Sequence, residues 1–185
     1  MNEVVNPMNE VINPMNEVIK IEVIKLPKIY IVGKQIRYSD EALNNGDNRL
    51  PGFWNECYKE NIFAPLESQT EYIYDVSHAG VFIDWYLGDG DFSYIVGMLM
   101  KKGATAPSGY VMRELEETDA ALIWIKCKSP TETRAVNFDS TDAAIKEIGR
   151  DYSKMKWCID LYHCQRSTIL DENGYAIIDC YIPLD

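Results

Sequence analysis

The sequence predicts an α+β domain, built as one antiparallel sheet with helices on one face and a cleft between two halves. Segments rich in β-branched and aromatic residues, which favour strands, make up most of the chain. Two helix-like segments interrupt them, and the order strand-helix-strand-strand occurs twice. Two such units commonly join as a single sheet that leaves a cleft between them.

The first half begins with a strand-like segment over residues 21–38. Pro27 marks an edge or a bend in it, because proline cannot donate a hydrogen bond to a neighbouring strand. A helix is expected over residues 49–61, with Pro51 near its first turn. Its apolar side chains recur at helical spacing and are Phe53, Trp54, Cys57 and Tyr58.

A hairpin is expected next, from a strand over residues 72–87, interrupted at Ala79-Gly80, to a strand over residues 92–100. Along the first of these strands, Trp85 should share a face with Ile83 and Leu87. Three aspartates surround the turn: Asp84, Asp89 and Asp91. They do not form the twelve-residue calcium-binding loop, so a plain turn is favoured.

The second half repeats the order of elements. It is expected to contain strands over residues 109–127, a helix over 142–153 capped by Asp139-Ser140-Thr141, a strand over 157–164, a turn at 171–174 and a last strand over 175–183. The two pseudo-repeats therefore span residues 21–103 and 109–185. They share a pattern of elements and only faint residue identity.

The first twenty residues hold a tandem repeat, M-N-E-V-V-N-P, M-N-E-V-I-N-P and M-N-E-V-I-K. Its spacing of seven would suit a coiled coil, but Pro7 and Pro14 would break a helix in each repeat. Three short copies are also too few for a solenoid. Residues 1–20 are therefore predicted to be an extended arm appended to a domain over residues 21–185.

The composition indicates a folded acidic protein. Of 185 residues, 46% are apolar, and the net charge is −11. The charge speaks against direct nucleic-acid binding, which needs clustered Lys and Arg. It is compatible with a cationic ligand or a basic protein partner, although an acidic surface usually serves only solubility, which is the default interpretation. No apolar stretch approaches the length of a membrane span, and the N-terminus lacks the features of a secretory signal.

The five cysteines are an odd number, which indicates free thiols in a reducing cytoplasm rather than a disulfide framework. They show no C-x-x-C spacing, and His163-Cys164, adjacent on a predicted strand, should point to opposite faces. We therefore predict no metal site and no cofactor.

The segment W-C-I-D-L-Y-H over residues 157–163 contains the most informative polar residue. On a strand, Cys158, Asp160 and Tyr162 share one face. A carboxylate inside such an apolar strand needs a donor, a cation or a water-filled pocket. Asp160 is therefore either a capping or half-exposed group, or the counter-charge in an aromatic ligand pocket.

Several segments, taken in order, carry a resemblance to a known family. They are L-P-K-I-Y-I-V-G-K-Q-I-R-Y (26–38), Phe53-Trp54, Y-D-V-S-H-A-G-V (74–81), F-S-Y-I-V-G-M (92–98), I-D-L-Y-H (159–163) and I-D-C-Y-I-P-L (178–184). Over residues 21–185 the chain resembles the gyrase-inhibitory-protein-like (GyrI-like) small-molecule-binding family. This family includes the effector-binding domains of multidrug-responsive transcription activators.

The resemblance implies a pseudo-twofold axis relating the two repeats and a ligand groove between them. Family members place an acidic residue, usually Glu, in the strand that matches I-D-L-Y-H, where it faces cationic aromatic ligands. Asp160 holds that position here with a side chain one methylene shorter. The activators also carry a DNA-binding helical domain, for which this chain has no room, so a stand-alone binding domain is implied.

The candidate ligand-binding residues are Asp160, Tyr162, Tyr94, Trp85, Trp124 and Trp54. Asp160 would supply charge, and the aromatic residues would supply stacking or apolar surface. Tyr94 should share a strand face with Phe92, Val96 and Met98, and core packing is its other role. Trp54 and Phe53 are adjacent on the predicted helix, so one should pack on the sheet while the other borders the groove.

The leading hypothesis is a non-enzymatic domain that sequesters or senses amphipathic, cationic or aromatic small molecules. One alternative, suggested by relatives of the family, is a hydrolase of reactive strained-ring compounds, with Asp160 as general base and Tyr162 as orienting donor. Another is a gyrase-inhibitor-like regulator that binds a basic protein surface. We assign no catalytic residue, because the two histidines and the cysteines form no recognisable nucleophile-base spacing.

Overall fold

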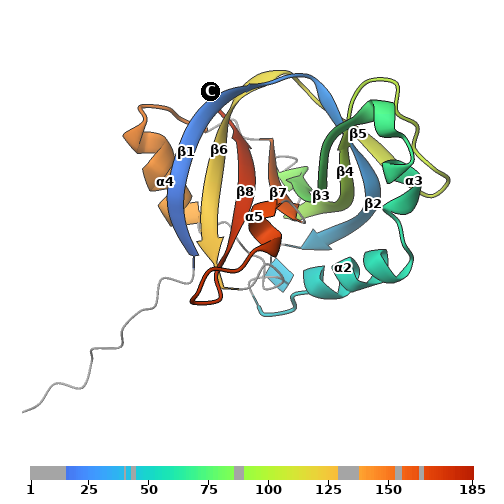
Figure 1. Cartoon of the computed structure of the whole chain (residues 1–185), viewed down its shortest axis with the longest axis horizontal. Helices are drawn as coiled ribbons and strands as arrows, with labels where there is room; N and C mark the ends of the chain where they lie inside the picture. The colour runs from blue at the N-terminus through green and yellow to red at the C-terminus, as the bar shows by residue number, and fades with distance from the viewer. Residues whose placement is uncertain are drawn as a thin grey trace, which may run out of the picture.

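A computed structural model describes residues 16–39, 41–42, 45–85, 90–128, 138–152, 156–162 and 165–185 (Figure 1). The strands are β1 (Asn16–Leu26), β2 (Ile29–Ser39), β3 (Ile73–Ile83), β4 (Asp91–Met100), β5 (Val111–Leu115), β6 (Thr118–Cys127), β7 (Trp157–Tyr162) and β8 (Ala176–Pro183). The helices are α2 (Leu50–Lys59), α3 (Ala64–Glu67), a short 3-10 turn (Thr70–Tyr72), α4 (Phe138–Glu147) and α5 (Gln165–Thr168). None of these helices is long and apolar enough to cross a membrane.

The strands form one eight-stranded antiparallel sheet in the order β1-β6-β8-β7-β3-β4-β2-β5. This order is symmetric about its centre when β2, β3 and β4 are matched with β6, β7 and β8. The two halves meet where β3 pairs with β7, and Gly80 lies directly opposite Asp160. The α+β fold class and its doubled strand-helix-strand-strand order are thus confirmed.

The outermost strand of each half comes from the other half of the chain. β1 pairs with β6, whereas β2, which follows it after two residues, pairs with β4 and β5 at the other end of the sheet. The expectation of one strand over residues 21–38 was therefore wrong, because the chain breaks at Pro27-Lys28 and crosses the molecule. The last residues of the predicted arm, from Asn16, belong to β1, and residues 1–15 lie outside the described part.

Helix α2 packs on the sheet through a stripe of buried residues at helical spacing, which are Leu50, Trp54 and Cys57. Pro51 occupies its first turn, as expected. Helix α4 corrects the sequence prediction, because it runs from Phe138 to Glu147 and Asp139-Ser140-Thr141 form part of its first turns. It ends before Gly149, whose φ of +71° is a left-handed conformation typical of helix ends.

The sheet buries side chains on both faces. On the face covered by α2 and α4, called here the helix face, one cluster surrounds Trp54 and Tyr94 and another surrounds Ile145 and Cys158. The opposite face carries a third cluster, which includes Val81, Ile159 and residues from the far ends of the sheet. Those ends meet in one cluster because the sheet is strongly curved (Figure 1).

Candidate functional site

Asp160 lies at the centre of the sheet, on the helix face of β7. Its strand is flanked on both sides, with Gly80 of β3 and Cys180 of β8 as the residues directly opposite it. Its side chain is almost completely buried, with 1% of the residue exposed. The alternation of β7 places Cys158 and Tyr162 on the same face, as the sequence predicted. The expectation of a half-exposed surface carboxylate is excluded by this burial.

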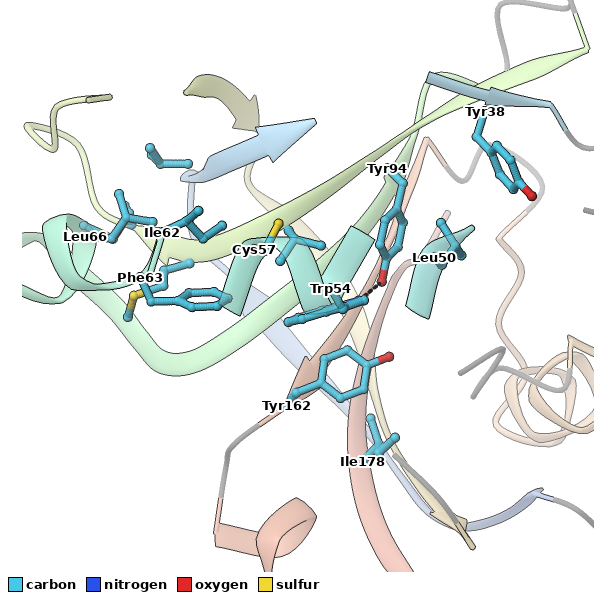
Figure 2. Packing of buried hydrophobic residues seen from close by; sticks show 14 of the residues in the cluster. Tyr38, Leu50, Trp54, Cys57, Ile62, Phe63, Leu66, Tyr94, Tyr162 and Ile178 are labelled. Atoms are coloured by element: carbon cyan, nitrogen blue, oxygen red, sulfur yellow. Dashed lines mark hydrogen bonds between the residues drawn. The ribbon is translucent and has the colours of Figure 1, made fainter. Parts of the chain in front are cut away.

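An aromatic cluster covers Asp160. Figure 2 shows the indole of Trp54 lying between Tyr94 and Tyr162. The indole N–H of Trp54 donates to the Tyr94 hydroxyl at 2.8 Å, and the ring packs edge-on against Tyr162 at a centroid distance of 4.9 Å. The Tyr162 hydroxyl makes a long contact of 3.5 Å to Asp160 Oδ2. Three of the predicted aromatic residues therefore gather above the predicted carboxylate.

Gly80 makes room for this arrangement. A Cβ at this position would lie 2.2 Å from the Tyr94 hydroxyl oxygen and 3.2 Å from the Trp54 ring. The absence of a side chain lets the Tyr94 hydroxyl lie against the strand next to Asp160. This role of Gly80 was not predicted from the sequence, although a glycine inside a strand pattern is a known indication of close approach. It also missed Phe82, which packs on Tyr94 at 4.6 Å between ring centroids.

The electrostatic state of Asp160 is set by burial. Burial raises its pKa to about 7, while hydrogen bonding from Cys180 and Tyr162 opposes the rise. Its Oδ1 atom is buried and has no hydrogen-bond partner, and no described Lys, Arg or His forms an ion pair with it. Burial and the nearby Asp160 also raise the pKa of Tyr94. The site is therefore a carboxyl group with no counter-charge from the described residues, inside an apolar, aromatic enclosure.

Trp85 reaches the helix face and packs against both of its clusters. The expectation that Trp85 shares a face with Ile83 was wrong, because Ile83 belongs to the opposite face. The reason is Asp84, whose φ of +77° is left-handed, which ends β3 and interrupts the alternation of side chains. Leu87, the third residue of that expectation, lies outside the described part.

Trp124 does not join the cluster. Trp124 of β6 pairs with Asp179 of β8, and Asp179 pairs with Leu161 of β7. Because paired residues share a face and Leu161 is next to Asp160 on β7, the Trp124 side chain lies on the face opposite Asp160. There the Lys20 ammonium lies 4.2 Å and the Arg166 guanidinium 4.5 Å from the ring centroid. Arg166 also forms a two-pronged ion pair with the buried Asp179. Trp124 therefore supports a surface charge network on the opposite face.

A second set of contacts holds α2 and α3 over the site. The ring of Phe63, between the two helices, stacks on His78 with centroids 3.5 Å apart and planes within 5°. His78 lies opposite Tyr162 and contacts Tyr58 of α2 at 3.3 Å and Glu67 of α3 at 3.2 Å. These contacts join the helices to β3 beside the aromatic cluster. The sequence spacing did not show that His78 connects β3 to α2 and α3.

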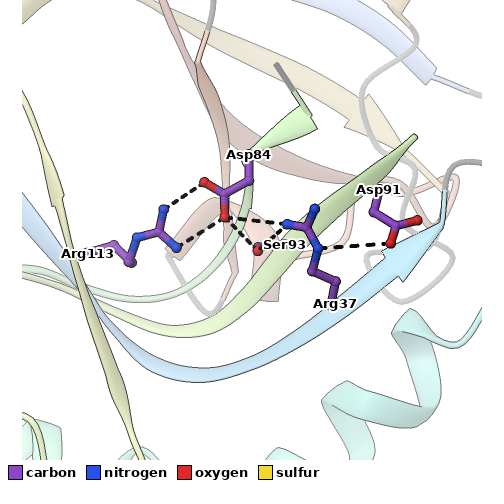
Figure 3. A network of polar contacts seen from close by, with 5 residues as sticks. All are labelled: Arg37, Asp84, Asp91, Ser93 and Arg113. Carbon is purple, nitrogen blue, oxygen red and sulfur yellow. Dashed lines mark hydrogen bonds and ion pairs between the residues drawn. The ribbon is translucent and has the colours of Figure 1, made fainter. Parts of the chain in front are cut away.

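Asp84, at the end of β3, belongs to an ion-pair network rather than to a cation site (Figure 3). Asp84 accepts hydrogen bonds from both terminal nitrogens of Arg113, at 3.1 and 2.7 Å, and from Ser93 at 2.7 Å. Arg37 lies 3.9 Å from the same carboxylate and 4.0 Å from Asp91. Asp89 lies outside the described residues. The network joins β5, β4 and β2 to the end of β3.

This network makes stability sensitive to acid. The hydrogen bonds from Arg113 hold the pKa of Asp84 below its ordinary value of 3.8. A carboxylate with a lowered native pKa stabilises the fold above its unfolded-state pKa, and that contribution is lost as the pH falls through the native value. Urea unfolding should therefore show that the free energy of unfolding of the wild-type chain falls below about pH 4. In Asp84→Asn this fall should be smaller. Parallel pH profiles would contradict this role.

An open groove of about 500 Å³ lies elsewhere, between the start of β1 and α4. Its lining combines apolar residues such as Val18, Ile21 and Ala143 with Glu17 and Glu147. The groove does not include Asp160 or the aromatic cluster. Where β3 and β7 join the two halves, the side chains of Trp54, Tyr94 and Tyr162 are buried beside Asp160.

Comparison with solved structures shows a shared fold. No protein-family profile and no curated protein matches the chain. The structure of SAV2435 bound to tetraphenylphosphonium has a TM-score of 0.62 and 15% identity, covering 90% of this chain and 94% of that protein. A Staphylococcus aureus MU50 protein assigned to bacterial transcription regulation has a TM-score of 0.59 and 16% identity, covering 90% and 98%.

A third structure, an integron cassette protein from the mobile metagenome of Vibrio cholerae, has a TM-score of 0.56 and 10% identity, with 92% of this chain and 99% of that protein covered. Each likeness extends over nearly the whole of both chains. At these identities, the chain shares the fold of these proteins.

Proposed function

We propose that the protein contains a GyrI-like domain that binds a lipophilic, cationic aromatic molecule at Asp160, beneath Trp54, Tyr94 and Tyr162. One observation carries this proposal. A carboxyl group lies 1% exposed at the centre of the sheet, with Oδ1 unsatisfied and with no ion pair from a described residue. Burying such a group costs free energy, because the charged carboxylate loses its contact with water. A ligand that places a positive charge beside the carboxylate offsets this cost.

The surrounding groups fit a ligand of that chemistry. Aromatic faces attract organic cations through their quadrupoles, and the attraction strengthens where water is excluded. The three aromatic rings also offer a large apolar surface at small cost in side-chain entropy. SAV2435, which shares the fold, is a protein that was solved with the lipophilic cation tetraphenylphosphonium. This precedent supports the ligand class and supplies a probe.

Binding requires the site to open. Trp54 is 9% and Tyr94 1% exposed, so a ligand reaches Asp160 only after α2 and its indole move. The Trp54–Tyr94 hydrogen bond of 2.8 Å must then break or be replaced. We expect binding to be slower than diffusion allows and to depend on the ligand's ability to refill the aromatic enclosure.

The experiment compares tetraphenylphosphonium with the neutral triphenylphosphine oxide by calorimetric titration and thermal shift. Wild type should bind the cation and show a raised melting temperature, since a ligand of the folded state alone stabilises it. Asp160→Asn should weaken the cation about tenfold or more, or about 1.4 kcal/mol, and leave the neutral probe nearly unchanged. The variant should fold normally, because Asp160 has no ion pair with a described residue to lose.

Asp119→Asn is the matched control. Asp119 stands at the start of β6 with a side chain 45% exposed and pairs with Arg150 at the surface. Its loss should leave both probes unaffected. If Asp160→Asn weakens the affinity for both probes equally, the electrostatic role of Asp160 is refuted. If wild type binds neither probe saturably, the binding function is refuted.

Binding is preferred to hydrolysis because a ligand that refills the aromatic enclosure excludes water again. A general base needs a water molecule within hydrogen-bond reach, and Asp160 is 1% exposed when side chains fill the enclosure. Turnover of an epoxide probe that Asp160→Asn abolishes would reverse this preference.

A further inference from the structure

Two cysteine thiols converge on Asp160 in the interior of the sheet. Cys158 of β7 and Cys180 of β8 have their sulfur atoms 3.6 Å apart. One ligand atom from each of the two cysteines and from Asp160 lies within 4.8 Å of the others. None of the three residues is more than 1% exposed. The binding function proposed above uses the carboxylate and leaves both thiols without a role.

The strand register creates this cluster. Asp160 pairs directly with Cys180, and Cys158 precedes Asp160 by two residues on the same face. The two cysteines are 22 residues apart in the chain. Their spacing therefore matches no metal-binding motif, and the prediction of no metal site rested on such motifs. The antiparallel pairing of β7 with β8 supplies the proximity that sequence spacing does not show.

We propose that Cys158, Asp160 and Cys180 form a binding site for a thiophilic divalent metal ion of the zinc and cadmium type. Two thiolates and one carboxylate are accepted ligands of such ions, and tetrahedral zinc with bonds of about 2.3 Å to sulfur separates two sulfurs by about 3.8 Å. The observed separation of 3.6 Å matches that requirement with little movement. The soft sulfur ligands select these ions over magnesium and calcium.

A second, independent observation points to a ligand at this position. Asp160 Oδ1 is buried and has no hydrogen-bond partner. A metal ion would satisfy this atom, and metal binding releases the two thiol protons to solvent. Three protein ligands leave the fourth position of a tetrahedral ion open for water or another small ligand. The ion would also place positive charge beside the carboxylate, so it should compete with an organic cation there.

The test is a cadmium titration of the reduced, full-length chain, followed by the ultraviolet charge-transfer band of cadmium thiolates and by calorimetry. We expect one ion per chain and a band of the size given by two thiolates. Cys158→Ser and Cys180→Ser should each lower affinity at least a hundredfold and reduce the band by half. Asp160→Asn should lower affinity about tenfold and leave the band in place.

The chain supplies its own controls in Cys57 and Cys127, which are also buried but stand outside the cluster. Cys57→Ser and Cys127→Ser should bind cadmium as wild type does. A band that survives the double change of Cys158 and Cys180 to serine, or that falls equally with the control variants, would overturn the site. If the cysteine variants fail to fold, the wild-type chain decides alone, since absence of a stoichiometric thiolate band overturns the proposal.

The metal site and the cation site can fail separately. Cys158→Ser should lose cadmium and keep tetraphenylphosphonium, because the thiol is not part of the aromatic enclosure. Cadmium binding by a wild-type chain that ignores tetraphenylphosphonium would support the metal site and refute the cation site. The reverse result on wild type would refute the metal site alone. Competition between the two probes on wild type would show that both reach Asp160.

Discussion

Gly97→Ala is expected to destabilise the domain by at least about 3 kcal/mol, among the larger costs of single substitutions. Gly97 of β4 lies directly opposite Gly33 of β2. A Cβ on Gly97 would lie 1.9 Å from the carbonyl oxygen of Val32 and 2.7 Å from the Cα of Gly33. These are backbone atoms of a paired strand and cannot turn aside as a flexible side chain does. The two strands would have to separate.

Gly52→Ala is the matched control for this prediction. Gly52 lies in helix α2, is exposed, and would have no atom within 4 Å of an added Cβ. Alanine should stabilise the helix by about 0.5–1 kcal/mol, because glycine loses more backbone entropy on folding. Urea unfolding of both variants against wild type measures the difference. Similar stabilities for the two variants would contradict the close approach of β2 and β4.

Trp54→Ala should cost about 3–5 kcal/mol, the usual range for removing a large buried aromatic residue. Trp54 is 9% exposed, contacts Tyr162 and Phe63 through its ring, and is the hydrogen-bond donor to Tyr94. Its loss removes this packing and leaves the Tyr94 hydroxyl, in a residue 1% exposed, without that donor.

Trp54→Phe separates the two contributions. Phenylalanine keeps most of the apolar ring but cannot donate to Tyr94, so the cost should fall to about 1–3 kcal/mol, the penalty of a buried unsatisfied polar group. Chemical unfolding, followed by far-ultraviolet circular dichroism, measures both variants. A Trp54→Phe variant as stable as wild type would show that the hydrogen bond to Tyr94 contributes nothing to stability. A Trp54→Ala variant as stable as wild type would show that α2 does not hold the cluster together.

Local patterns were sufficient to predict much of this fold. Hydrophobic alternation located the strands, Pro51 and the helical spacing of Trp54 and Cys57 located α2, and alternation along β7 put Tyr162 beside Asp160. These features depend on residues close together in the chain. The burial of Asp160 was not among the features predicted, because the pattern left a half-exposed position open, and only the structure shows that all six residues of its strand are buried.

The features that sequence reasoning missed depend on contacts between distant segments. Trp124 alternates correctly along β6, but only the position of α2 decides which face of the sheet becomes the site. The left-handed backbone of Asp84 is stabilised by Arg113, twenty-nine residues away, and moves Trp85 to the other face. The approach of the Cys158 and Cys180 sulfur atoms likewise follows from the register that pairs Asp160 with Cys180, which no single strand encodes.

The exchange of outer strands has a consequence for synthesis in the cell. β1 leaves the ribosome before the other described strands, but its partner β6 belongs to the second half of the chain, and β6 in turn pairs with β8, which is made later still. Until then β1 carries an unsatisfied backbone edge and apolar side chains such as Ile21 and Ile24. Such delayed, non-local pairing slows folding and exposes nascent chains to aggregation. A chaperone that covers an extended apolar segment would therefore act on this protein at its N-terminal strand, before the site exists.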